Sequence, residues 1–189
     1  MIRQAQPKDV TDVINLVMII LKDMELAVFD KLSDEEVLNL LEEAYTKYPT
    51  YRYGYQTMIV KEIDGQVAGI AVGYPDKREK TIDADFITLL NEHGLSDDYR
   101  FFTEIEAFPN EWYLDTLVTS PDFRRQGVAN SLLDALPEIA RQQGCDKIGL
   151  NCDQINQQAQ QVYLKKGFKK MGETTLSNHR YDHLQWLIN

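Results

Sequence analysis

Cysteine is scarce in this chain of 189 residues, which contains only Cys145 and Cys152. Two cysteines cannot build the disulfide framework of a small secreted domain, and no histidine stands near them at a zinc-ligand spacing. We therefore expect a cytoplasmic protein with no structural metal. Repeats and low-complexity tracts are also missing, and a content of 43% hydrophobic and 26% charged residues predicts a single globular domain over residues 1–189.

Long apolar runs are absent as well. The most apolar segment, residues 14–21, is interrupted by Asn15 and is far too short to cross a bilayer. Near the N-terminus, Lys8, Asp9 and Asp12 stand where a signal peptide would be apolar. We therefore expect no membrane association.

Positive charge is in deficit, with 20 Lys and Arg against 30 Asp and Glu and a net charge of −10. This balance argues against nucleic-acid binding, which needs clustered cations. The charge is unevenly spread, because residues 121–170 hold eight Lys and Arg against five Asp and Glu, a local +3, and the remainder carries −13. A small polyanion bound in that segment and a cationic molecule bound elsewhere would suit this pattern. Solvated surfaces arranged by chance would suit it equally.

Hydrophobic periodicity and turn residues predict a mixed α/β order. The expected strands are 1–5, 57–63, 66–74, 111–119, 147–152, 168–173 and 181–188, and the expected helices are 7–28, 33–48, 82–91, 130–143 and 156–166. An insertion at about 75–109 separates two core strands, and it is either a lid or binding loop or a surface insertion. Strict alternation along the strand 111–119 would place Glu111, Tyr113, Asp115 and Leu117 on one face and Trp112, Leu114, Thr116 and Val118 on the other.

The stretch 115–129 organises the chain. An extended run is followed by Pro121, two arginines, a glycine and an amphipathic helix. The first amides of a helix lack partners within the helix and carry partial positive charge, so they can bind a phosphate. Gly127 lets the backbone approach such a ligand, and Ala129 keeps the next turn small. These features predict an anion site at the start of this helix.

Two motifs then resemble those of the GCN5-related N-acetyltransferase (GNAT) superfamily. The run 124–129, Arg-Arg-Gln-Gly-Val-Ala, matches the pattern Arg/Gln, any, any, Gly, any, Gly/Ala. The second motif, an asparagine before a helix that ends in Tyr, three residues, Gly, Phe, is similar to Asn156, Ala159, Tyr163, Lys165, Gly167 and Phe168. The resemblance is close over 111–173. Over 1–74 it consists only of the order of the helices and strands.

The resemblance implies a largely antiparallel central sheet with splayed middle strands and helices on both faces. It also implies an acetyl coenzyme A site, with the pyrophosphate on the amides of 125–130 and the pantetheine arm along 117–119. The implied cosubstrate-binding residues are Leu117, Val118, Thr119, Arg124, Arg125, Gln126, Gly127, Val128, Ala129, Asn130, Asn156 and Tyr163. No metal is implied. Thr119 and Asn130 depart from the residues commonest in the family.

The resemblance further implies catalytic roles. Tyr163 would donate to the departing thiolate, and a backbone amide near Leu117 would stabilise the oxyanion. Glu111 and Asp115 are candidate bases, although many relatives deprotonate the amine through water. We expect a small-molecule or peptide amine acceptor, and acidic Glu104 and Glu106, with Tyr99, Phe101 and Phe102, would suit a cationic one. A non-catalytic acyl-coenzyme A sensor, O-acetyl transfer, a longer acyl donor and a homodimer are left open.

Overall fold

The structure, a computed structural model, describes residues 1–176 and 179–188. Its strands are β1 (Ile2–Gln4), β2 (Met58–Ile63), β3 (Gln66–Pro75), β4 (Trp112–Thr119), β5 (Lys147–Asp153), β6 (Lys169–Leu176) and β7 (His179–Leu187). Its helices are α1 (Val10–Asp23), α2 (Asp34–Lys47), α3 (Ala84–Glu92), α4 (Val128–Gln142) and α5 (Gln157–Lys166). No helix within these residues is long and apolar enough to cross a membrane.

The strands form a seven-stranded sheet in the order β1-β2-β3-β4-β5-β7-β6. Strands β4 and β5 are parallel, and the other neighbours are antiparallel. The β4–β5 pairing covers two residue pairs, Trp112 with Ile148 and Tyr113 with Gly149. Beyond these pairs the two strands separate, which confirms the predicted mixed, mostly antiparallel sheet with splayed middle strands.

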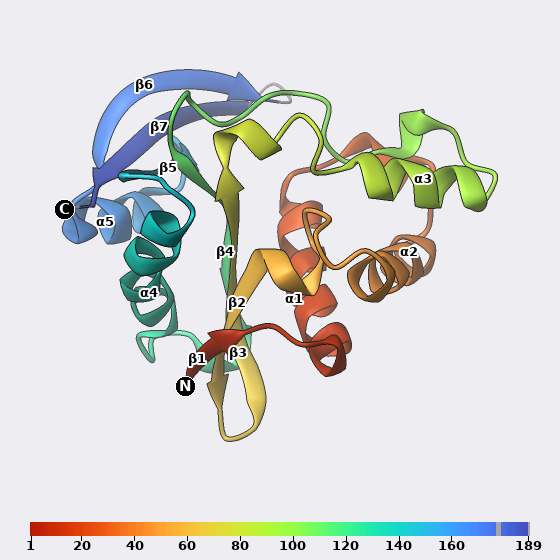
Figure 1. The fold of residues 1–189 in the computed structure, drawn as a ribbon, viewed down its shortest axis with the longest axis horizontal. Helices are drawn as coiled ribbons and strands as arrows, with labels where there is room; N and C mark the ends of the chain where they lie inside the picture. Colours follow the sequence, from red (N-terminus) through yellow and green to blue (C-terminus); the bar gives the residue numbers. More distant parts are fainter. Residues whose placement is uncertain (177–178, 189) are drawn as a thin grey trace.

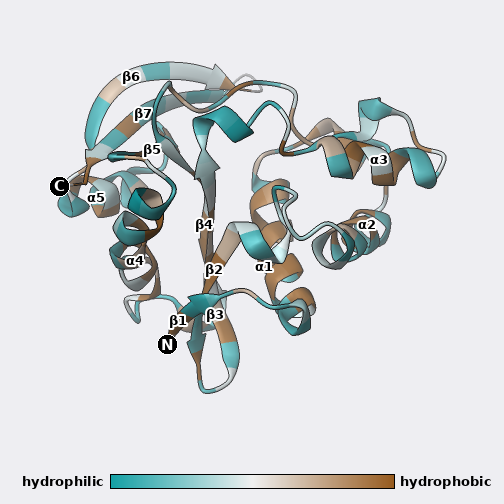
Figure 2. Cartoon of the chain, viewed as in Figure 1, coloured by the Kyte–Doolittle hydropathy of each residue, from teal (hydrophilic) through white to brown (hydrophobic). Residues whose placement is uncertain are grey.

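Helices cover both faces of the sheet, as predicted (Figure 1). Helices α1, α2 and α3 pack on one face and share a core cluster with β2 and β3. Helix α4 packs on the other face, where its apolar side joins residues of β4, β5 and β7, and α5 lies beside it. Figure 2 shows the hydrophobic sides of α1 and α4. The chain thus has two cores, one on each side of the sheet.

Local signals set several element boundaries. The β2–β3 hairpin turns at Asp64 and Gly65, with φ of 50° and 81°, as its Asp-Gly sequence predicts. Helix α2 begins at the predicted capping box, where the N–H of Glu36 donates to Ser33 Oγ at 3.3 Å. The first helix is shorter than predicted: α1 ends at Asp23 because Glu25 has a φ of 51°, and residues Ala27–Asp30 form a separate 3-10 turn.

Strand β4 contains a bulge that breaks the predicted alternation. Val72 pairs with Thr116 and Gly73 pairs with Leu114, which leaves Asp115 without a partner on β3. Leu117 therefore packs in the α4 core together with Trp112 and Leu114, and Val118 packs in the α1 core. The prediction that grouped Leu117 with Tyr113 and Val118 with Leu114 is wrong, because the extra residue inverts the faces beyond it.

The segment between β3 and β4 builds part of the core. Phe86 of α3 stacks on Tyr51 at 5.1 Å and on Phe101 at 4.9 Å between ring centroids. Phe86, Leu89 and Leu90 are buried against α1 and α2. The alternative of a purely surface insertion therefore does not describe this segment.

Candidate functional site

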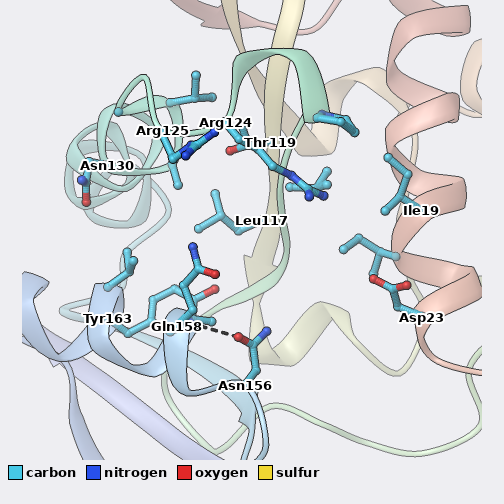
Figure 3. A pocket seen from close by; sticks show the side chains of 18 residues that line it. Ile19, Asp23, Leu117, Thr119, Arg124, Arg125, Asn130, Asn156, Gln158 and Tyr163 are labelled. Atoms are coloured by element: carbon cyan, nitrogen blue, oxygen red, sulfur yellow. Dashed lines mark hydrogen bonds between the residues drawn. The ribbon is translucent and has the colours of Figure 1, made fainter.

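A cavity of about 680 Å³ opens where β4 and β5 have separated. It lies between α1 on one side and α5 on the other, with the end of β4 and the start of α4 between them (Figure 3). The residues that line it are Ile19, Ile20, Asp23, Leu117, Val118, Thr119, Pro121, Arg124, Arg125, Gly127, Val128, Ala129, Asn130, Asn156, Gln158, Ala159, Val162 and Tyr163. Every predicted cosubstrate residue except Gln126 is among them. The amide of Gln126 instead donates to the Asp122 carbonyl at 3.3 Å.

The start of α4 lines this cavity, and its N-cap residue has no side chain to accept from the first-turn N–H groups. Gly127 is the N-cap residue and has a φ of 75°, and no neighbouring atom lies within 4 Å of the point that a Cβ on this residue would occupy. The left-handed backbone, rather than lack of space, therefore favours glycine here. Arg124 and Arg125 line the cavity next to these donors. A ligand with phosphate groups would meet both the first-turn amides of α4 and the two guanidinium groups.

Helix α5 contributes the opposite wall. Asn156 caps the helix, since its Oδ1 accepts from the Ala159 N–H at 3.0 Å, and its side chain also faces the cavity (Figure 3). Tyr163 lines the cavity and packs edge-on against Phe168, with 5.6 Å between ring centroids. Burial, with a smaller effect of Cys152, raises the pKa of the Tyr163 hydroxyl well above its usual range. Tyr163 therefore stays protonated at neutral pH and can act as a hydrogen-bond donor.

A buried arginine organises the polar groups beside the β4 bulge. Arg52 is 1% exposed, and its guanidinium pairs with Asp83 at 2.8 Å and with Asp115. The Tyr74 hydroxyl lies 2.6 Å from the guanidinium and donates to Asp115 at 2.9 Å. The predicted base Asp115 is thus held by a cation and a hydroxyl. Sequence reasoning missed Arg52, although a charged residue between Tyr51 and Tyr53 in a tyrosine-rich stretch was an available signal.

Glu111, the other predicted base, is fully buried where β4 and β5 meet. Its carboxylate accepts from the Phe108 N–H at 2.7 Å and from the Gln185 amide at 2.7 Å, and it lies 3.1 Å from His183 Nε2. Gly149 makes room for it, because a Cβ there would lie 1.9 Å from Glu111 Oε2. Within the described residues, Glu111 is outside the lining of the cavity.

Glu106 lies beside this group of residues. Its carboxylate accepts from the Tyr113 hydroxyl at 2.7 Å, and its backbone N–H donates to Glu79 at 2.7 Å. Burial, followed by the charge of Asp115, raises the pKa of Glu106 to about 7. Of the aromatic residues that we grouped with Glu106 for acceptor binding, Phe101 is instead a buried core residue.

Comparison with known proteins identifies close relatives. The sequence profile described as Acetyltransferase (GNAT) family matches residues 25–168. A solved structure described as an acetyltransferase is 47% identical, with all of both chains covered and a TM-score of 0.91. An N-acetyltransferase from Staphylococcus aureus Mu50 is 33% identical over 98% of this chain and 100% of that chain, with a TM-score of 0.88. GCN5-related N-acetyltransferase 4, chloroplastic, from Arabidopsis thaliana is 34% identical over 59 residues, which span 31% of this chain and 20% of the plant protein.

Proposed function

The chain belongs to the acetyltransferase (GNAT) family, and from that premise we propose that it transfers an acetyl group from acetyl coenzyme A to an amine by direct attack in a ternary complex. The observation that carries this proposal is the cavity, which collects the residues of both family motifs around one space of about 680 Å³. No metal enters the proposal. The acceptor is a small molecule or a peptide that carries an amine.

The cavity suits the shape and charge of coenzyme A. The pyrophosphate would lie on the amides of 125–130, with Arg124 and Arg125 beside it. The pantetheine arm would follow 117–119, where β4 has lost its parallel neighbour and can pair with an added extended segment. Asn156 and Tyr163 would contact the arm from the side of α5.

Three tasks remain for the chemistry: the amine must lose a proton, the oxyanion must be stabilised and the thiolate must be protonated. The bulge leaves the backbone of Asp115 outside the β3–β4 pairing, which supports a backbone donor near Leu117 for the oxyanion. Tyr163 retains its proton at neutral pH and faces the cavity, so it can donate to the departing sulfur. These contacts would be made in the transition state, where they accelerate the reaction.

The roles of Glu111 and Asp115 as bases stay predictions. Asp115 is bound by Arg52, and Glu111 receives two N–H donors and lies beside His183. Both carboxylates are thus already held by partners within the protein. These contacts favour a positioning role for both residues.

The proposal is tested by thiol release from acetyl coenzyme A with a panel of polyamines, aminoglycosides, peptide amines and alcohols. Release that depends on an amine, with an acetylated amine as the product, is the expected result. Binding of acetyl coenzyme A without release on any acceptor would favour the alternative, a non-catalytic sensor of acyl-coenzyme A. Release with alcohols alone would favour O-acetyl transfer. A cytoplasmic location and a homodimer also stay predictions.

A further inference from the structure

Glu106 occupies the point at which β4 and β5 separate. We propose that its carboxylate receives the proton of the acceptor, and that the acceptor is a cationic amine bound against Glu106 and Asp115. This inference rests on the proposed function, because it presupposes acetyl transfer to an amine. It assigns the base to a residue that precedes β4, whereas the candidates from the sequence were Glu111 and Asp115.

Hydrogen bonds fix Glu106 to both of the separating strands. The Tyr113 hydroxyl of β4 donates to Glu106 Oε2 at 2.7 Å. The Asn151 amide of β5 donates to the Glu106 carbonyl at 3.0 Å and to the Tyr113 hydroxyl at 3.2 Å. Asn151 is itself oriented by His183, whose Nδ1 lies 2.7 Å from its Oδ1. Glu106 is therefore held in place by β4 and β5 together rather than by its own loop.

The position of Glu106 suits an acceptor that approaches the thioester from the end at which β4 and β5 are still paired. Along the β4 backbone, Asp115 follows Tyr113 by two residues and Leu117 follows Asp115 by two, and the bulge at Asp115 turns the Leu117 side chain to the face opposite Tyr113. Leu117 is the first β4 residue that lines the cavity. An extended amine can thus reach a thioester near Leu117 while its charged part lies against Asp115 and Glu106, and a bound water can complete the proton path.

The carboxylates around this point outnumber the cations. Arg52 pairs with Asp83 and Asp115. Glu79 accepts from the neutral N–H groups of Glu106 and Ala107, and Glu106 accepts from a neutral hydroxyl. Within residues 1–176 and 179–188, neither Glu79 nor Glu106 forms an ion pair. A bound ammonium group would offset this excess of negative charge.

A second, independent observation points to a ligand at this cluster. Tyr51 is 1% exposed, and among the described residues its hydroxyl is the buried side-chain polar atom without a hydrogen-bond partner. Tyr51 directly precedes Arg52, whose guanidinium pairs with Asp83 and Asp115, and burial and then the charge of Asp83 raise the pKa of the Tyr51 hydroxyl. Buried polar groups are normally satisfied, and a second amino group of a polyamine could donate to this oxygen.

Titratable and charged groups from several elements lie around Glu106 or around the residues that hold it. These groups are Arg52 and Tyr53 before β2, Tyr74 of β3, Glu79 before α3, Tyr113 and Asp115 of β4, and Tyr181 and His183 of β7. Burial and Asp115 raise the pKa of Glu106 to about 7, and Arg52 and the Tyr113 hydrogen bond oppose that rise. A carboxylate with this pKa is ionised in part at neutral pH and is a stronger base than an exposed one.

The proton balance follows from these positions. The ammonium gives one proton to the Glu106 carboxylate, and the free amine forms a C–N bond to the carbonyl carbon of the thioester. The C–S bond then breaks, and the departing sulfur takes a proton from Tyr163, which recovers one from the nitrogen. Glu106 releases its proton to water. The products are the acetylated amine, coenzyme A as the thiol and one proton.

The test compares kcat/KM across pH for the wild type, Glu106→Gln and Asp98→Asn, which neutralises an exposed carboxylate of the same segment. Each enzyme is assayed with the best strongly basic polyamine and with a weakly basic amine that is already deprotonated at neutral pH. For the polyamine, the wild-type rate falls as the pH drops through about 7. Glu106→Gln loses the inflection near pH 7, its rate instead keeps rising with pH as free amine accumulates, and at neutral pH it is slower by about 10²–10⁴. The weakly basic amine is acetylated by both enzymes at similar rates, and Asp98→Asn behaves as the wild type.

A loss in Glu106→Gln that is equal for both amines, or an inflection near pH 7 that persists in this variant, would overturn the assignment while leaving acetyl transfer intact. A wild type that acetylates no amine would overturn the proposed function and the assignment with it. If Glu106→Gln does not fold, a carbon NMR titration of the wild-type carboxyl groups decides the matter. The assignment requires a Glu106 pKa near 7 that falls when spermidine is added, and an ordinary pKa unaffected by spermidine would refute it.

Discussion

Replacing Gly149 by alanine tests the burial of Glu111 at the β4–β5 junction. The new Cβ would lie 1.9 Å, 2.1 Å and 2.4 Å from the three carboxyl heavy atoms of Glu111. Glu111 has no exposed surface, so its carboxylate cannot move aside into solvent. Overpacking costs about 1–3 kcal/mol. Displacement would also leave the half-buried Phe108 N–H and Gln185 amide without this acceptor, at up to about 1–3 kcal/mol for each group.

We therefore expect Gly149→Ala to lower the free energy of unfolding by about 3 kcal/mol or more. The assay is equilibrium unfolding in urea, in a double-mutant cycle with Glu111→Ala. Once the Glu111 side chain is removed, the added methyl group occupies vacated space and should cost little. Equal costs of Gly149→Ala with and without Glu111 would refute the reasoning. Gly94→Ala is the control, since nothing lies within 4 Å of its Cβ position and its φ of 71° exposes it to backbone strain alone.

Three further predictions concern the cavity and the polar cluster. Tyr163→Phe should lower the rate of thiol release but leave the affinity for acetyl coenzyme A nearly unchanged in calorimetry, and an unchanged rate would remove Tyr163 from its role. Arg52→Met should lower the free energy of unfolding in urea by about 3–5 kcal/mol, because it leaves Asp83 and Asp115 without their buried cation. A decrease no larger than that of an ordinary surface substitution would contradict the pairing. Glu106→Gln should raise the Tm at pH 8 but not at pH 4. The folded pKa of Glu106 is raised from 4.5 to about 7, so the folded state binds more protons in that window and wild-type stability falls as the pH rises through it. An equal Tm difference at both pH values would contradict this sign.

Features encoded by neighbouring residues could be predicted from the sequence. The capping box of Ser33 and Glu36 and the turn at Asp64 and Gly65 depend on contacts within four residues, and both are present. The cosubstrate residues are similarly local, because 117–130 is one continuous strand, turn and helix start. The cavity gathers nearly all of them for that reason.

Features that depend on distant partners could not be predicted. The bulge at Asp115 is a matter of register with β3, and no residue within β4 signals it. Arg52 is buried by carboxylates 31 and 63 residues away, so its environment is invisible to a local pattern. Ile19, Ile20 and Asp23 of α1 read as ordinary helix positions, and they join the cavity because α1 packs across the end of β4.

The central claim is acetyl transfer to an amine in the cavity between α1 and α5. Mass spectrometry of a polyamine incubated with acetyl coenzyme A and the purified protein tests it most directly. The account predicts a product heavier by one acetyl group on nitrogen, formed in step with free coenzyme A and at a much reduced rate by Tyr163→Phe. An unmodified polyamine, together with unmodified peptide amines and aminoglycosides, in the presence of protein that binds acetyl coenzyme A would contradict it.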